Sequence, residues 1–419
     1  MKKHIKLLVV LGIILVGSFS FYLFKGYKKD ALVYENNKIK PSSSGIAMML
    51  ETSAGSGNYE MTTRSEWPTE GYVFNANLSK CENGSELSWD NENKKVLMSG
   101  NKSDKCYVYF DVYVKPQVLL ADYVKSLYTG TQGANNIYYH DTSLTNGAGD
   151  NSYRFAGASD KVNNYVCFGS TQSPCPDDNK YRIIGVFGDK VKLIKSDYAT
   201  TALLGADGDY SKMYTANNWG NSAYKGNNLA NVAAYNWNKT GQNTWSLSNL
   251  NKTNLNQNFI TNIGADWAAK IAETTWKVGG NIWANIGTQP SKTAYQNEIV
   301  NPVTTNSQDN ATELKAKIGL MYASDYGFAA APSAWTTALY SYDGAAIKNV
   351  NWMYMGLYEW TISRNADDSY DAFRVYNTGD VSHNNVGDDA YAVRPVFYLT
   401  SSVNYVSGSG SATDPIVVN

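Results

Sequence analysis

The sequence predicts an α+β protein with an N-terminal transmembrane helix, a small β-rich module and a large mixed domain with few helices and long loops. Three observations lead to this prediction. The chain has 419 residues, more than one domain usually contains. A single uncharged apolar run lies near its start. The remainder shows short alternating patterns between turns rich in Gly, Asn and Ser, with few stretches of helical periodicity.

The composition narrows the class of protein. The chain holds 36 Lys+Arg and 37 Asp+Glu, a net charge of −1, and no basic clusters, which argues against a nucleic-acid partner. Hydrophobic residues make up 43% of the chain and aromatic residues 13%, so a folded core is expected rather than disorder. Few charges beside many Tyr, Asn, Ser and Gly are typical of an extracellular, β-rich surface.

Residues 1–29 are predicted to be a signal anchor. The run from Leu7 to Phe24 has no charge, and its 18 residues approach the length that spans a bilayer. The small residues Ser18 and Ser20 are followed by further apolar residues, unlike a usual cleavage site. A cleaved signal peptide and a buried apolar helix are the alternatives. Lysines flank both ends, so the positive-inside rule does not decide the orientation. We expect a single pass through the cell membrane with the bulk of the chain outside.

Residues 30–44 read as a polar stalk and residues 45–115 as the small β module. Strand patterns occur at Gly71–Phe74 and Tyr107–Phe110. The Asn-Gly step within Glu82–Ser85 is a hairpin signal.

The four cysteines form two local pairs, Cys81 with Cys106 and Cys167 with Cys175. Local disulfides are the favoured interpretation, although four cysteines allow three pairings and free buried thiols are the alternative. Neither pair has CxxC spacing and no histidine neighbours them, so no metal site is predicted.

A connecting helix is expected over residues 116–129, and the large domain over 130–419. The clearest hairpin spans 181–195, turns at Gly188-Asp189, and should bury Val191 and Leu193 while its lysines face water.

Three further elements are expected in the large domain. Apolar residues at helical spacing predict a helix over 254–276. Residues 317–322 read as a central strand and 393–399 as another. The stretches 205–257 and 279–311 are aperiodic and rich in Asn, Gly and Trp.

No catalytic motif occurs in the sequence: it has no GxSxG, HExxH, Walker loop, GxGxxG or EF-hand loop. The three histidines, His4, His140 and His383, have no neighbours that suggest a triad, and a lone loop histidine is usually solvated. We therefore expect no enzyme, no catalytic residue and no cofactor.

Several segments carry a family resemblance: Asn163–Gly169, Cys175–Asn179, Tyr181–Phe187, Lys317–Gly327, Trp360–Arg364, Val393–Leu399, and Gly408–Gly410 with Asp414-Pro415. With them, residues 130–419 resemble an uncharacterised family of membrane-anchored bacterial surface proteins. The ending, a W-x-x-S-R segment followed by a strand, a Gly turn and R-P-V, is similar to the C-type-lectin-like fold of formylglycine-generating-enzyme relatives.

The resemblance implies a scaffold without either known chemistry. Formylglycine-generating enzymes hold copper with cysteines in the C-terminal part of the domain, and this chain has none after Cys175. Calcium-dependent lectins use Glu-Pro-Asn or Gln-Pro-Asp together with Trp-Asn-Asp, and none of these occurs here.

Loops of the C-terminal part are the predicted ligand-binding region, because rigid strands in such folds present variable loops. The segment Asn377–Asp389 is polar, and its composition suits sugar hydroxyls, while its oxygens also suit calcium. Aromatic residues just upstream suit sugar faces or protein partners, or else a core. The predicted binding residues are Trp352, Tyr354, Tyr358, Asp380, His383, Asn384, Asn385, Asp388 and Asp389.

Three residues are predicted to be structural. Arg394 precedes Pro395 in an apolar strand and should pair with an acid or backbone carbonyls. Arg364 follows a strand and precedes Asp367 and Asp368, which suggests a buried salt bridge. Trp360 is expected in the core.

The favoured function is a non-catalytic, membrane-anchored cell-surface protein that binds a glycan or an extracellular protein. A structural component of a surface assembly is one alternative. A tethered extracellular enzyme on a formylglycine-generating-enzyme-like scaffold is the other.

Overall fold

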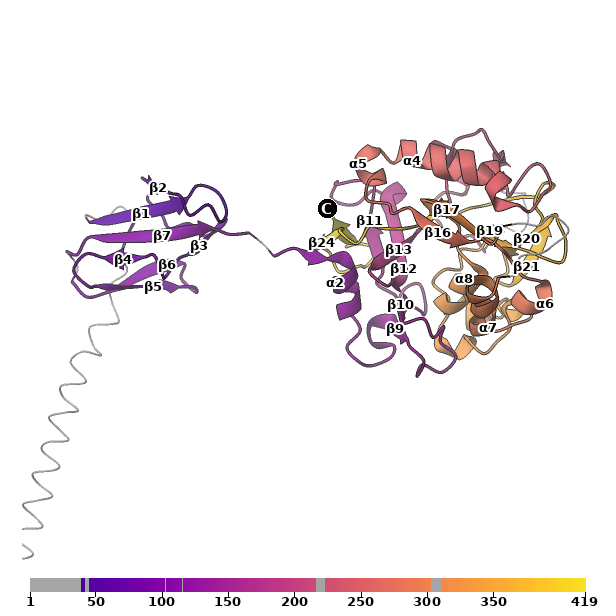
Figure 1. The fold of residues 1–419 in the computed structure, drawn as a ribbon, viewed down its shortest axis with the longest axis horizontal. Helices are drawn as coiled ribbons and strands as arrows, with labels where there is room; N and C mark the ends of the chain where they lie inside the picture. Colours follow the sequence, from indigo (N-terminus) through magenta and orange to yellow (C-terminus); the bar gives the residue numbers. More distant parts are fainter. Residues whose placement is uncertain (1–38, 42–44, 102, 115, 216–222, 303–310) are drawn as a thin grey trace, which may run out of the picture. The chain divides into compact units, whose positions relative to one another are not determined.

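A computed structural model describes residues 39–41, 45–101, 103–114, 116–215, 223–302 and 311–419 (Figure 1). The chain divides into two compact units, residues 1–116 and 117–419. The predicted anchor and most of the predicted stalk lie outside the described residues. None of the helices within the described ranges has the length and apolar composition needed to cross a membrane.

Unit 1 is strand-rich. Its strands are β1 (Ile46–Glu51), β2 (Tyr59–Thr62), β3 (Tyr72–Phe74), β4 (Lys80–Cys81), β5 (Glu86–Asp90), β6 (Lys95–Ser99) and β7 (Cys106–Val112). One sheet has the order β2-β1-β7-β3, with β4 also paired to β7, and β1 runs parallel to β7. The hairpin β5–β6 packs on this sheet, because the Trp89 ring lies 6.2 Å from that of Phe74 and 5.5 Å from that of Phe110.

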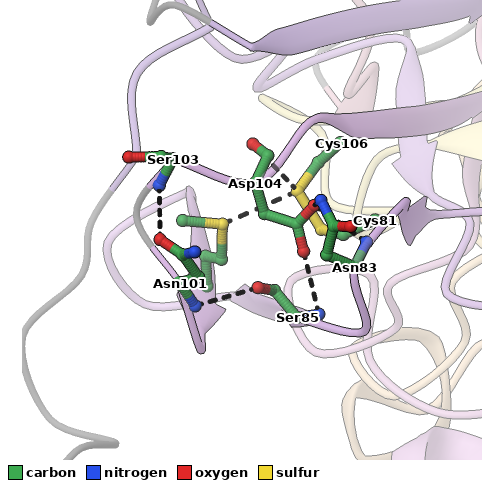
Figure 2. The surroundings of a disulfide bond; sticks show 8 residues. Cys81, Asn83, Ser85, Asn101, Ser103, Asp104 and Cys106 are labelled. Atoms are coloured by element: carbon green, nitrogen blue, oxygen red, sulfur yellow. Dashed lines mark hydrogen bonds between the residues drawn. A yellow bond between two sulfur atoms is a disulfide. The ribbon is translucent and has the colours of Figure 1, made fainter.

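The predicted hairpin at Glu82–Ser85 is wrong. Strands β4 and β5 belong to different sheets, so this segment connects two layers instead of two paired neighbours. The buried Asp104 carboxylate holds the connection, accepting the backbone N–H groups of Asn83 at 2.9 Å and Ser85 at 3.1 Å (Figure 2). A side-chain acceptor thus replaces the cross-strand hydrogen bonds that an Asn-Gly hairpin would make.

Both predicted disulfides are present. Cys81 and Cys106 lie directly opposite each other on β4 and β7, with Cα atoms 4.0 Å apart. Cys167 and Cys175 are joined in unit 2, with Cα atoms 5.8 Å apart. Disulfides are typical of an oxidising, extracellular compartment.

Unit 2 is a mixed α+β structure with several sheets. A ten-stranded sheet has the order β18-β23-β13-β12-β11-β25-β24-β8, with β10 paired to β12 and β9 paired to β10. Smaller sheets are β14-β15-β22, β16-β17 and β19-β20-β21. The strands are β8 (Val118–Leu119), β9 (Ile137–His140), β10 (Ser152–Phe155), β11 (Tyr165–Cys167), β12 (Lys180–Phe187), β13 (Lys190–Lys195), β14 (Tyr210–Met213), β15 (Ala233–Asn236), β16 (Thr274–Lys277), β17 (Glu313–Ala316), β18 (Ile318–Gly319), β19 (Glu359–Arg364), β20 (Asp371–Val375), β21 (Val381–Asn385), β22 (Ala390–Tyr391), β23 (Val396–Tyr398), β24 (Asn404–Ser407) and β25 (Ile416–Val418).

The α-helices described in unit 2 are short. They are α2 (Leu120–Ser126), α3 (Thr201–Leu204), α4 (Phe259–Asn262), α5 (Ala265–Ala268), α6 (Trp283–Ile286), α7 (Ser291–Tyr295), α8 (Ala323–Ala329) and α9 (Ala345–Lys348), with π-helical segments at Leu250–Asn258 and Gln296–Val300. Within the segment predicted to be a connecting helix, 116–129, α2 forms over Leu120–Ser126 and packs into the core of unit 2, and the predicted hairpin is confirmed by β12 and β13.

The prediction that the hairpin lysines face water is wrong for Lys192, whose exposed fraction is 1%. Strand β13 lies inside the large sheet, between β12 and β23, and both of its faces are covered. Lys192 is accommodated because its ammonium meets the carboxylate of Asp325 at 2.5 Å.

The single helix predicted over 254–276 is also wrong. Gly264 has φ +89°, which ends the helical path between α4 and α5. Residues 274–277 form strand β16 instead, paired to β17. The apolar stripe was nevertheless a core signal, since Phe259, Ile263 and Ile271 are buried.

Of the two strands predicted late in the chain, one is placed differently. Within residues 317–322 only Ile318 and Gly319 form a strand, and this β18 lies at the end of the large sheet instead of its centre. The prediction at 393–399 is confirmed in part, since strand β23 covers Val396–Tyr398.

Buried and half-buried asparagines organise part of the segments expected to be aperiodic. The Asn254 side chain donates to Leu204 O at 2.8 Å and accepts the Asp209 N–H at 3.0 Å. Asn256 likewise donates to Ile318 O and accepts the Ile318 N–H, both at 3.0 Å. Amide side chains supply donors and acceptors where the backbone lacks regular partners, so much of the Asn content serves the fold.

Candidate functional site

The structure divides the predicted binding residues into two groups. Trp352 and Tyr354 are buried, with exposed fractions of 1% and 3%, and Tyr358 is half-buried. Trp352 donates its indole N–H to Phe155 O at 2.8 Å, and Tyr354 donates its hydroxyl to Asn377 O at 2.5 Å. These rings belong to the interior of unit 2.

The remaining predicted residues lie on or beside the β20–β21 hairpin, where the sequence suggested a loop. His383 and Asn384 are neighbours on β21, so their side chains point to opposite faces. His383 Nδ1 lies 2.7 Å from Asp371 Oδ2, and its ring lies 5.3 Å from that of Trp283. Asn384 instead donates to Asp389 Oδ2 and to the Tyr391 hydroxyl, each at 2.6 Å.

The other three predicted residues, Asp380, Asn385 and Asp388, lie at or near the two ends of β21. The Asn385 side-chain oxygen accepts the backbone N–H of Asp388 at 3.0 Å. Asp380 accepts a hydrogen bond from the Thr378 hydroxyl at the opposite end of the strand. These contacts hold the hairpin, and the predicted residues lie on different faces of it.

The residues predicted to be structural are all buried. Arg394 makes a two-pronged ion pair with Glu359, at 2.7 and 2.9 Å, and donates to Met353 O at 2.7 Å. Trp360 is fully buried and donates to Tyr235 O at 2.9 Å. Arg364 is 1% exposed, and burial lowers its pKa to about 10.

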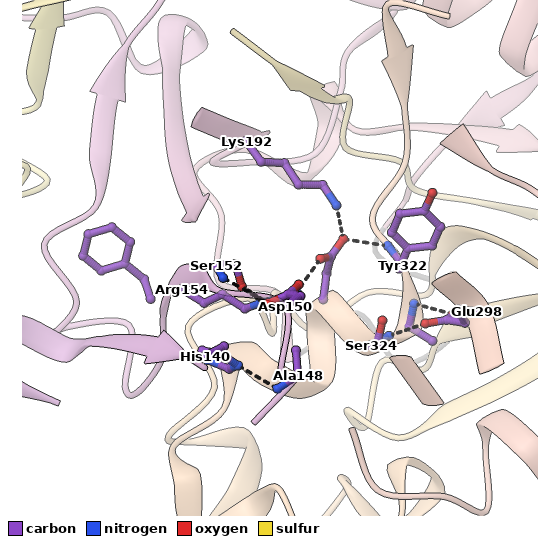
Figure 3. A network of polar contacts seen from close by, with 12 residues as sticks. His140, Ala148, Asp150, Ser152, Arg154, Lys192, Glu298, Tyr322 and Ser324 are labelled. Atoms are coloured by element: carbon purple, nitrogen blue, oxygen red, sulfur yellow. Dashed lines mark hydrogen bonds and ion pairs between the residues drawn. The ribbon is translucent and has the colours of Figure 1, made fainter. Parts of the chain in front are cut away.

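A cluster of buried charges lies near α8 (Figure 3). Arg154 pairs with Asp150 at 2.5 Å, and Asp325 lies between Arg154 and Lys192. The Glu298 carboxylate accepts the backbone N–H groups of Ala323 and Ser324 at the start of α8. Arg154, Lys192, Glu298 and Asp325 are buried. Their contacts join different elements of the fold.

His140 beside this cluster is not a solvated loop residue. Its exposed fraction is 0%, and its Nδ1 accepts the Ala148 N–H at 3.0 Å. Burial among aromatic rings lowers the pKa of His140 well below its usual value, so the imidazole stays neutral.

A polar cleft that the sequence did not reveal opens elsewhere on unit 2. It consists of two adjoining cavities of about 180 Å³ each, both lined by Asp177, Asp197 and Asn227. The first cavity, the acidic half, adds carboxylate, amide and hydroxyl side chains: Asp178, Tyr198, Thr200, Tyr224, Asn228 and Asn231. The second, the basic half, adds cations and hydroxyls: Ser159, Tyr165, Lys180, Arg182, Ser196 and Lys225.

Asp197 is fixed between the two halves. Its carboxylate oxygens accept the Tyr224 hydroxyl at 2.8 and 2.9 Å, and the Asn227 backbone N–H at 2.9 Å. Burial, followed by the nearby Asp197 charge, raises the pKa of Tyr224, which keeps the hydroxyl protonated and donating. The carboxylate is therefore preorganised, and no cation among the described residues pairs with it.

Arg182 forms the floor of the basic half. The guanidinium is buried between the rings of Tyr165 and Trp352, 4.4 and 4.6 Å from their centroids. Its N–H groups donate to Asn164, to Ser159 and to backbone carbonyls. Within the described ranges no carboxylate lies at ion-pair distance, and burial lowers the pKa of Arg182 to about 10.

Lys225 provides the accessible cation. Its ammonium lies 4.4 Å over the Tyr354 ring, and within the described part of the chain it makes no ion pair or hydrogen bond. Lys180, the third cation, pairs with Asp177 at 2.8 Å. The predicted aromatics Trp352 and Tyr354 thus contact Arg182 and Lys225, the cleft cations that make no ion pair with any residue the structure describes, one ring against each.

Chemically, the cleft offers fixed hydrogen-bond donors and acceptors of both charges. Among the described residues, no three His, Cys, Asp or Glu side chains gather as metal ligands. Its lining residues are scattered from Ser159 to Ala412, with no shared motif. The one local signal is the acidic segment Cys175–Asn179, which the second disulfide holds beside the cleft. Comparison of the chain with models of protein families, with curated proteins and with solved structures found no match.

Proposed function

We propose that this protein is a non-catalytic, membrane-anchored surface protein that binds a glycan in the polar cleft of unit 2. The observation that carries the proposal is the fixed Asp197 carboxylate, which adjoins the amides of Asn227, Asn228 and Asn231. Carboxylate and amide side chains accept from and donate to sugar hydroxyls, and a preorganised acceptor loses little entropy when a ligand arrives.

The size and setting of the cleft support this proposal. Each half, at about 180 Å³, is smaller than the roughly 300–1,000 Å³ of pockets for drug-sized molecules. A single sugar ring or a charged substituent is the kind of group that each half would hold. The disulfides agree with an extracellular location, and the proposed anchor at residues 1–29 would keep the cleft at the cell surface. We further propose that unit 2 is a lectin-like scaffold.

The test is binding of the full-length protein, purified under oxidising conditions in detergent, to a broad glycan array. A specific signal is expected, and Asp197→Asn should weaken it strongly, because one of the two acceptor oxygens becomes an NH2 donor that faces the donating Tyr224 hydroxyl and Asn227 N–H. Asp388→Asn is the matched control, since Asp388 lies in the exposed turn after β21 and outside the cleft.

Three results would contradict the proposal. The first is loss of binding in Asp388→Asn with retention in Asp197→Asn, which would move the site to the hairpin. The second is a folded protein that binds no glycan but self-associates, which would favour a surface assembly. The third is turnover of the glycan, which would favour an enzyme.

A further inference from the structure

We infer that the glycan is acidic, with a carboxylate or sulfate group that occupies the basic half of the cleft beside Lys225, Ser159 and Tyr165. This inference rests on the proposed glycan-binding function and specifies its ligand class. Three observations carry it: the charge balance of the basic half, the donors left open there, and the position of the acidic half beside it.

The charge balance of the basic half favours an anion. Its lining holds three cations, Lys180, Arg182 and Lys225, and two carboxylates. The Lys180–Asp177 pair is internally compensated, and Asp197 is already held by neutral donors. Arg182 is a buried cation with no carboxylate at ion-pair distance in the described ranges, an arrangement that is unfavourable until an anion approaches.

The open donors show how the anion would be held. Lys225 has no hydrogen-bond acceptor among the described residues, so its N–H groups are available. The Ser159 oxygen accepts from Arg182 at 2.7 Å, which leaves its O–H free to donate into the cavity. Arg182 therefore acts through Ser159 and through its charge, since its own N–H groups are already occupied. Hydrogen bonds that involve an ionised group are stronger than neutral ones.

The neighbouring acidic half distinguishes an acidic sugar from a free anion. Asp197 and Asn227 line both cavities, so a ring whose anionic substituent lies near Lys225 would present hydroxyls toward Asp197 and the amides beyond it.

Lys348 adds a further positive charge near Lys225, and burial followed by this charge lowers the pKa of Lys225. An anion at the basic half would reverse that effect.

The test measures calorimetric binding of the full-length protein to three oligosaccharides of equal length: a neutral galactose oligomer, an oligogalacturonate and a sulfated galactose oligomer. We expect at least one acidic probe to bind tightly, and its affinity to fall as NaCl rises. Lys225→Met should weaken that binding by about tenfold or more, because it removes the charge but keeps an apolar stem over Tyr354. Whichever acidic probe binds distinguishes the carboxylate from the sulfate.

Matched variants separate the inference from misfolding and from the proposed function. Lys190→Met, which removes a cation outside the cleft, should leave binding unchanged, and Lys225→Arg should retain most of it. Equal binding of neutral and acidic probes, insensitive to Lys225→Met in a protein of unchanged melting temperature, would overturn the acidic-ligand inference and leave glycan binding intact. Failure of all three probes and of the wider array would overturn both.

Discussion

Lys192 and Asp325 form an ion pair inside unit 2, with Nζ 2.5 Å from Oδ2 and side chains exposed by 1% and 3%. Lys192 belongs to the inner strand β13, and Asp325 lies in the first turn of α8. The same carboxylate accepts the Tyr322 N–H at 3.0 Å and lies 3.6 Å from the Arg154 guanidinium. One buried acid thus compensates two buried cations and joins a helix to the sheet.

This relationship predicts a large effect of Asp325→Asn on stability. The amide keeps the size of the side chain but leaves Lys192 without its counter-charge in the interior. Breaking a buried pair from one side typically costs about 3–5 kcal/mol, and we expect a loss of that order in the free energy of unfolding. Chemical denaturation followed by tryptophan fluorescence would measure it.

Lys192→Met serves as the matched variant. It removes the cation and keeps an apolar chain, while Asp150 and Asp325 still flank Arg154. Its loss should be clearly smaller than that of Asp325→Asn. Equal stability of Asp325→Asn and the unaltered protein would show that the ion pair has no net role.

Lys192 also shows where reasoning from sequence succeeds and where it stops. The alternation of residues 190–193 correctly gave a strand and its buried neighbours Val191 and Leu193. The same alternating pattern fits a strand with one face in solvent and an inner strand whose lysine meets a buried counter-charge. The sequence does not distinguish the two, because the partner Asp325 is 133 residues away. Local periodicity identifies the element, whereas its surroundings depend on contacts that are distant in sequence.

Contacts that are distant in sequence also explain why the candidate site was not predicted. The predicted His383 and Asn384 are adjacent in sequence, but a strand sends them to opposite faces. Asp197 and Lys225 are distant in sequence, yet they line one cavity. Trp352 and Tyr354 were predicted to bind a ligand, whereas in the structure they are buried and contact cations of the cleft from the interior, a position that no spacing reveals.

The disulfide of unit 1 predicts a domain-specific loss of stability. Replacing both Cys81 and Cys106 by Ser opens a bridge between residues 25 positions apart, worth about 3.5 kcal/mol by the chain-entropy model. Scanning calorimetry should show a lower unfolding temperature for unit 1 alone, with glycan binding by unit 2 unchanged. Two reactive thiols at these positions in the folded, unaltered protein would contradict the bridge itself.

The corresponding pair in unit 2 should behave differently. Replacing Cys167 and Cys175 by Ser frees the segment that carries Asp177 and Lys180 into the cleft. We expect weaker ligand binding together with a smaller loss of stability, about 2.5 kcal/mol, because the residues are only 8 positions apart. Unchanged affinity in a calorimetric titration would show that the disulfide does not contribute to ligand binding in the cleft.

Substitution of Trp360 should destabilise the core of unit 2 without removing any charge. Its ring is fully buried beside Tyr391, and the indole N–H donates to Tyr235 O. Trp360→Ala should lower the free energy of unfolding of unit 2 by about 3–5 kcal/mol, while Trp360→Phe should cost less because it fills more of the cavity. An unchanged melting temperature for Trp360→Ala would be incompatible with the buried position.

The His383–Asp371 contact predicts a pH-dependent contribution to stability. The hydrogen bond to Asp371, with Nδ1 and Oδ2 2.7 Å apart, raises the pKa of His383 above its ordinary value. A pKa higher in the folded than in the unfolded state means that protonation favours folding. The stabilisation is fully present below the unfolded value of about 6.5 and disappears as the pH rises through the folded value. Since the pair is partly exposed, its size should stay below about 1 kcal/mol.

Asp371→Asn tests this contribution directly. In the unaltered protein an NMR titration of the His383 ring should give a pKa above the ordinary value, and the variant should bring it down. The difference in unfolding free energy between the two proteins should be largest near pH 5 and vanish above the titration of His383. Asp388→Asn, which removes an exposed carboxylate in the turn after β21, should leave the titration almost unchanged. The same His383 pKa with and without the Asp371 carboxylate would show that this contact does not govern protonation.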